Sequence, residues 1–96
     1  MKFYLQLTPK AKNEFLEAYD WYEKQKYGLG DTFKKDVYNF ISIILENPKH
    51  YPIKDKQLRE IVLKKFPFVI IYRIDEHTNT IYIASIFHTK RNPKLK

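Results

Sequence analysis

The chain has 96 residues, a length that suits one domain spanning residues 1–96 with one hydrophobic core. It has no cysteine, which excludes disulfide bridges, thiolate metal sites and cysteine nucleophiles. No apolar run approaches the length of a membrane span, and the N-terminal residues lack the apolar stretch of a signal peptide. We therefore expect a cytoplasmic protein that does not bind membranes.

The net charge of +7 belongs entirely to the second half of the chain. Residues 1–48 contain seven Lys and seven acidic residues, whereas residues 49–96 contain eight Lys and three Arg against four acidic residues. Clustered cations attract phosphates or an acidic protein, although lysine also serves as a general solubilising residue. The C-terminal half is therefore the first place to search for a binding surface.

The first half predicts one strand and a helical hairpin. Residues 3–7 have the aromatic and aliphatic character of a strand, and Thr8-Pro9 then forms a helix start. Apolar residues recur at helical spacing up to the glycines at 28 and 30, where this helix should end. A second helix, capped by Asp31 or Thr32, should run to Asn47-Pro48.

The second half changes to the pattern of strands. Residues 58–63, 66–74 and 80–87 are rich in Ile, Val, Tyr and Phe and are separated by short polar links. Short links favour three consecutive antiparallel strands. The expected fold is therefore α+β, in the order β-α-α-β-β-β, with the N-terminal helical hairpin packed on one face of a small, mainly antiparallel sheet.

Several basic and aromatic side chains belong to the predicted sheet or to its C-terminal exit. Cleavage of RNA without a metal needs proton-transfer groups, cations for the phosphate and aromatic rings for the bases. The residue types for these tasks are present: His88 and Glu60 for proton transfer, Arg59, Arg73 and Arg91 for charge, Lys90 beside them, and Tyr72 or Phe87 for stacking. Arg73 is as suited to a structural ion pair as to a ligand, and for His88 taken alone the sequence favours a structural or surface role.

Other kinds of site find no support in the sequence. The three histidines at 50, 77 and 88 have no metal-ligand spacing, and Gly28-Leu29-Gly30 lacks the lysine and the context of a phosphate-binding loop. There is also no Gly-x-Ser-x-Gly nucleophile elbow. We therefore expect no metal and no cofactor.

The sequence resembles the RelE/ParE superfamily of toxins from type II toxin–antitoxin systems over nearly its whole length. The resemblance rests on the order and spacing of Ala18-Tyr19-Asp20-Trp21-Tyr22-Glu23, Gly28-Leu29-Gly30 with Phe33, Asn47-Pro48 with Tyr51-Pro52, Arg59, Phe66-Pro67-Phe68, Ile71-Tyr72-Arg73-Ile74, Ile81-Tyr82-Ile83-Ala84, and Phe87-His88-x-x-Arg91-x-Pro93. It implies a growth-arresting toxin in a hetero-oligomer with a cognate antitoxin that supplies an acidic or helical segment.

Two kinds of target follow from this resemblance. ParE-like members inhibit DNA gyrase, and RelE-like members cut mRNA on the ribosome, with a functional face to which Arg59, Tyr72, His88 and Arg91 would correspond. RelE-like nucleases commonly place a catalytic Tyr near the C-terminus, whereas no Tyr or His follows His88 here. The expectation is therefore a ParE-like inhibitor of gyrase, with a RelE-like ribonuclease and an inactive basic binding module of the same fold as alternatives.

Overall fold

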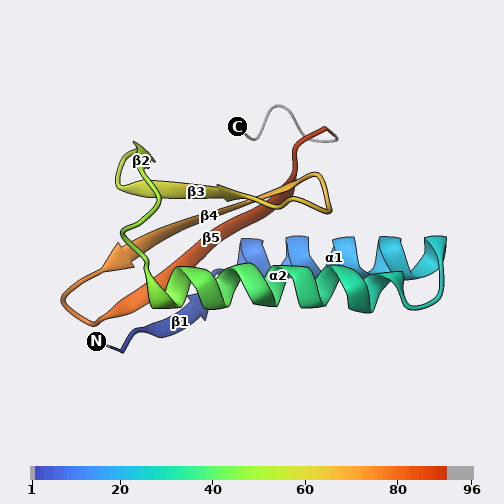
Figure 1. Cartoon of the computed structure of the whole chain (residues 1–96), viewed down its shortest axis with the longest axis horizontal. Coiled ribbons are helices and arrows are strands. Elements are labelled where there is room, and N and C mark those ends of the chain that lie inside the picture. Colours follow the sequence, from blue (N-terminus) through green and yellow to red (C-terminus); the bar gives the residue numbers. More distant parts are fainter. Residues whose placement is uncertain (1, 91–96) are drawn as a thin grey trace.

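The computed structural model describes residues 2–90, which form one sheet and two helices (Figure 1). The sheet has five strands in the order β1-β5-β4-β3-β2, and it is antiparallel except for the parallel pair β1 and β5. The predicted α+β class and the order of the elements are confirmed. The elements are β1 (Tyr4–Leu7), α1 (Pro9–Gln25), α2 (Leu29–Glu46), β2 (Ile53–Asp55), β3 (Leu58–Val62), β4 (Phe68–Asp75) and β5 (Thr80–His88).

The short strand β2 was not predicted. It pairs antiparallel with β3 through an irregular register, and all three of its residues are exposed. The turn between the two strands uses left-handed backbone at Lys56 and Gln57, with φ of 48° and 70°. Neither residue type marks such a turn in a sequence, where Gly and Asn are the usual signals. A three-residue strand with two charged residues therefore has no distinctive pattern.

Helix α1 begins as predicted. The Thr8 hydroxyl accepts a hydrogen bond from the Ala11 N–H at 3.2 Å, and Pro9 occupies the first turn. The same hydroxyl donates to the Ala84 carbonyl of β5 at 3.1 Å. The N-terminus of α1 is thereby joined to the last strand of the sheet.

Helix α2 begins earlier than predicted, so the cap expected at Asp31 or Thr32 is wrong. Gly28 is the N-cap, with a left-handed φ of 88°. The Glu23 carboxylate of α1 accepts hydrogen bonds from the N–H groups of Gly28 and Gly30, both at 2.9 Å. A side chain of the preceding helix therefore takes the place of a local cap and shortens the link between the helices.

Both helices lie on the same side of the sheet, and the core fills the space between them (Figure 1). Alternate strand residues point into this core, while the residues between them belong to the opposite face, which we call the outer face. Neither helix covers the outer face (Figure 1). The buried strand residues on the helix side are Ile61, Phe68, Ile70, Tyr72, Ile81, Ile83 and Ile86.

Candidate functional surfaces

Arg59 and Tyr72 hold the segment that follows α2. They are register partners on β3 and β4, on the helix side of the sheet. The Tyr72 hydroxyl donates to the Pro48 carbonyl at 2.7 Å, and the Arg59 guanidinium donates to the carbonyls of Lys49 and Tyr51. Burial raises the pKa of Tyr72 to about 12. The Tyr72 ring is fully buried, so it does not lie where it could stack on a nucleobase.

His88 lies at the other end of the sheet, on the same side as the helices. Its ring meets Phe68 edge to face at 5.1 Å, and it borders a small hollow with Glu14 and Glu17 of α1. The His88 Nδ1 accepts a hydrogen bond from the Lys90 N–H at 3.0 Å. Arg91 lies outside the described residues.

Arg73 belongs to the outer face. It lies between Tyr72 and Ile74, which point to the core, and it is exposed. Its guanidinium carbon lies 4.3 Å from the centre of the Tyr82 ring, its register partner on β5. Within residues 2–90 the ion pairs are Lys10–Glu14 and Lys49–Glu76, so no described carboxylate pairs with Arg73.

The structure therefore distributes the candidate residues of the sequence over three places. Arg59 and Tyr72 hold the segment after α2, His88 and Lys90 lie at the C-terminal end of β5, and Arg73 lies on the outer face. Glu60 is also on the outer face, opposite Ile71, whereas Phe87 is buried against Val69 at the far end of that face. No single cleft brings a base, an acid and a cation from this set together within the described residues.

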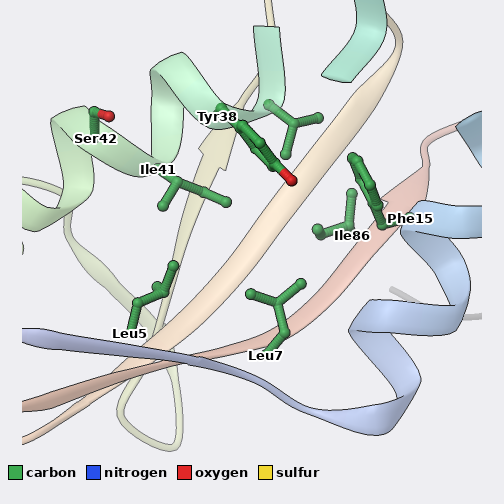
Figure 2. Close-up of a pocket in the computed structure, with 8 residues that line it drawn as sticks. Leu5, Leu7, Phe15, Tyr38, Ile41, Ser42 and Ile86 are labelled. Atoms are coloured by element: carbon green, nitrogen blue, oxygen red, sulfur yellow. The ribbon is translucent and has the colours of Figure 1, made fainter. Parts of the chain in front are cut away.

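An apolar groove lies between β1 and the two helices and was not anticipated from the sequence. It has a volume of about 340 Å³, which falls in the range of ligand-binding pockets. Figure 2 shows Leu5 and Leu7 pointing from β1 towards Ile41 and Tyr38 of α2. Only two hydroxyl-bearing residues border it. The groove is lined by Leu5, Leu7, Phe15, Val37, Tyr38, Ile41, Ser42 and Ile86.

Strand β1 is also a free edge of the sheet. The N–H group of Tyr4 donates to the carbonyl of Asn79, just before β5, and that of Thr8 donates to the Ile83 carbonyl of β5. Every second residue of a strand directs its backbone N–H and C=O groups to the same side. Since Tyr4 and Thr8 face β5, Leu5 and Leu7 direct their backbone groups away from the sheet. The two residues that floor the groove therefore also offer unpaired backbone donors and acceptors.

A carboxylate closes the neighbouring edge of β5 where β1 ends. Glu14 of α1 accepts hydrogen bonds from the Ile86 N–H at 2.9 Å and from the Ser85 hydroxyl at 2.8 Å. Lys10 neutralises this carboxylate, with 3.1 Å between its Nζ and Glu14 Oε2. On this side of the sheet the open edge is thereby restricted to β1, and β2 forms the opposite edge.

Residues 2–90 contain no group of three His, Cys, Asp or Glu side chains that could hold a metal ion. None of their helices is both long and apolar enough to cross a membrane. The structure thus offers two surfaces for partners: an apolar groove beside a free strand edge, and a sheet face that neither helix covers, where Arg73 lies over the Tyr82 ring.

The ParE toxin of the parDE type II toxin–antitoxin system is described by a family model that matches residues 5–93. The chain therefore belongs to this toxin family. None of the curated proteins compared with the chain matches it.

Solved structures of toxins agree in fold. A chain of the chromosomal ParDE system from P. aeruginosa has a TM-score of 0.70 and 21% identity, covering 91% of this chain and 96% of that one. A chain of the intact E. coli RelBE complex has a TM-score of 0.73 and 15% identity, covering 93% and 99%. A chain of a Mycobacterium tuberculosis RelBE2 complex has a TM-score of 0.65 and 15% identity, covering 92% and 99%.

Proposed function

We propose that this toxin arrests growth by ParE-like inhibition of DNA gyrase and that a cognate antitoxin neutralises it. The observation that supports a binding mechanism is the separation of the candidate catalytic residues. The Arg59 guanidinium already donates hydrogen bonds to two backbone carbonyls, and Tyr72 is buried. His88 lies at the opposite end of the sheet. General acid–base catalysis requires such groups around one reacting atom.

A supercoiling assay tests this proposal. Purified gyrase is supplied with relaxed plasmid and ATP, with and without the chain, and the loss of supercoiled product is measured. We expect inhibition that depends on the concentration of the chain and disappears when the antitoxin is added. Full supercoiling at a large molar excess of the chain would contradict the gyrase target.

A RelE-like ribonuclease is the second candidate, because the fold matches RelE chains as well as it matches a ParE chain. His88 and Lys90 lie together at the end of β5 and, with Arg91, could act on a phosphate. Mapping mRNA 5′ ends after induction separates the two candidates. Codon-linked cleavage supports the ribonuclease, and growth arrest without cleavage supports the gyrase inhibitor. If neither growth nor either assay responds, the chain is an inactive basic binding module of the same fold.

We further propose that the antitoxin docks in the apolar groove and pairs with β1. Apolar lining favours an amphipathic segment, and the free backbone groups of Leu5 and Leu7 favour an added strand. The Lys34 ammonium lies 5.8 Å from the centre of the Tyr38 ring at the border of the groove, which suits an acidic flank. The neighbouring reading frame should therefore encode a small acidic protein.

Two matched variants test this docking site. Leu5→Glu places a carboxylate in the groove, whereas Val62→Glu places one on the outer face, and both positions are already exposed. We expect Leu5→Glu to abolish binding of the protein encoded by the neighbouring reading frame and Val62→Glu to leave it intact. Equal binding by both variants would place the antitoxin elsewhere.

A further inference from the structure

The outer face has a cross-strand row of side chains centred on Arg73. Tyr82 on β5 is its register partner, and Gln6 on β1 is the register partner of Tyr82. Continuing the β3–β4 register places Leu58 on the other side of Arg73. Gln6 and Arg73 are exposed, and Tyr82 and Leu58 are half-buried, although no helix covers them. The row therefore crosses four strands on a face that neither helix covers.

The position of Arg73 over Tyr82 prepares the guanidinium for a ligand. The guanidinium carbon lies 4.3 Å from the centre of the Tyr82 ring, which attracts the cation without using its N–H donors. No carboxylate within residues 2–90 pairs with it. A planar arginine held in this way matches a carboxylate or a phosphate with two parallel hydrogen bonds.

The surroundings of Arg73 favour a carboxylate on a protein. Glu60 and Asp75 lie on the same face. Their charges oppose the successive phosphates of a nucleic acid more strongly than the single charge of one carboxylate. The nearby side chains are apolar: Ile71 is half-buried and Val62 is 60% exposed. Arginine and tyrosine among partly exposed aliphatic residues are the usual composition of the energetically dominant part of a protein interface.

We propose that the outer face, centred on Arg73 and Tyr82, is the surface that binds the toxin's target, and that the target is a protein that presents an Asp or Glu side chain among apolar residues. This inference rests on the proposed gyrase function and specifies which face performs it. It also assigns the antitoxin and the target to opposite sides of the sheet, since the groove lies on the helix side.

The test compares charge reversals at two exposed positions. Arg73→Glu changes the proposed surface, and Lys24→Glu changes the charge equally at the far end of α1. The affinity of each purified variant for reconstituted DNA gyrase is measured, with thermal unfolding as the folding control. We expect Arg73→Glu to weaken gyrase binding by at least about 30-fold, corresponding to about 2 kcal/mol, and Lys24→Glu by less than about 3-fold.

Arg73→Lys keeps the charge but loses the planar pair of donors, and it should fall between the wild type and Arg73→Glu. Binding of a single-stranded RNA oligonucleotide to the same variants provides the competing outcome. A loss of RNA affinity in Arg73→Glu, with gyrase binding unchanged, would overturn the protein surface in favour of a nucleic-acid surface.

Failure of the inference and failure of the proposed function are distinguishable. If the wild-type chain binds gyrase and folded Arg73→Glu binds it equally well, the function stands and the surface is wrong. If the wild-type chain does not bind gyrase, the proposed target is wrong. Growth arrest in cells then tests whether the outer face binds the true target. Arrest by folded Arg73→Glu at the wild-type level would overturn it, whereas loss of arrest, with arrest by Lys24→Glu retained, would support it.

Discussion

Tyr72 and Arg59 lie opposite each other on β4 and β3, and both donate hydrogen bonds to backbone carbonyls of the segment that joins α2 to β2. The three carbonyls they satisfy belong to Pro48, Lys49 and Tyr51. Because this segment has no regular structure of its own, the two side chains take the place of backbone partners. They connect the end of the helical hairpin to the centre of the sheet.

The first prediction concerns Arg59. Replacing it with Ala leaves two carbonyls without their donor, and we expect the free energy of unfolding to fall by about 1 to 3 kcal/mol. Chemical denaturation measures this change. Lys54→Ala, on exposed β2, is the control and should change stability by less than about 0.5 kcal/mol. Equal stability of Arg59→Ala and the wild type would show that the hydrogen bonds contribute nothing.

The second prediction concerns alkaline pH. Burial raises the pKa of Tyr72 to about 12, from 10 for an unperturbed tyrosine. Since the folded pKa is the higher one, the stability linked to the protonated hydroxyl is complete below pH 10 and is lost as the pH rises from about 10 to 12. Tyr72→Phe should therefore reduce the decline of the unfolding free energy over this window.

Tyr19 provides the comparison for this measurement. Its hydrogen bond to Asp31 raises the pKa of Tyr19 to about 12 as well, but this side chain lies on the surface of the helical hairpin. Solvent screens an exposed interaction, so Tyr19→Phe should change the alkaline decline less than Tyr72→Phe does. The reverse order of the two variants would contradict the assignment of the effect to the buried hydroxyl.

The third prediction concerns the edge of β5. Glu14 accepts from both Ser85 and Ile86, so Glu14→Leu leaves a backbone N–H without its partner. We expect a loss of about 1 to 3 kcal/mol and faster hydrogen exchange at the Ile86 amide. Asp20→Leu, which removes an exposed carboxylate of the same helix that does not line the hollow beside His88, is the control. Unchanged exchange at Ile86 in Glu14→Leu would mean that the carboxylate does not protect this edge.

The fourth prediction concerns the turn of the helical hairpin. A Cβ at Gly30 would lie 2.9 Å from the Tyr19 carbonyl oxygen and 2.8 Å from Glu23 Oε1. Gly30→Ala should therefore destabilise the fold by about 1 to 3 kcal/mol, because the two helices must separate. At Gly28 a Cβ meets nothing within 4 Å, and only the positive φ opposes substitution. Gly28→Asn should thus have the smaller effect on thermal unfolding, since Asn tolerates left-handed backbone.

Local chemistry explains which features the sequence could predict. Thr8-Pro9 contains its own capping signal, and the aliphatic runs of β4 and β5 contain the period of strands, so both could be read directly. The start of α2 could not, because its capping group is Glu23 of another helix, brought close only by folding. Long-range contacts of this kind leave no local pattern.

The lack of a local pattern also explains why the sequence could not predict how the candidate site residues are arranged. The sequence identified Arg59, Tyr72 and Arg73 as basic or aromatic strand residues, but the face of each depends on a register that it does not contain. The groove could not be predicted from any local pattern, because its lining residues Leu5, Phe15, Tyr38 and Ile86 come from four separate elements. Exposed apolar residues such as Tyr38 were its only local signal, and single exposed aromatics are common.

The parallel pairing of β1 with β5 affects how the protein can be synthesised. Tyr4–Leu7 leaves the ribosome well before its register partners, residues 80–83, have been made. Contacts so distant in sequence form slowly, and here they cannot form until β5 has also been synthesised. The floor of the groove therefore forms after both helices have been made, and an antitoxin that recognises it would meet only toxin chains that already contain β5.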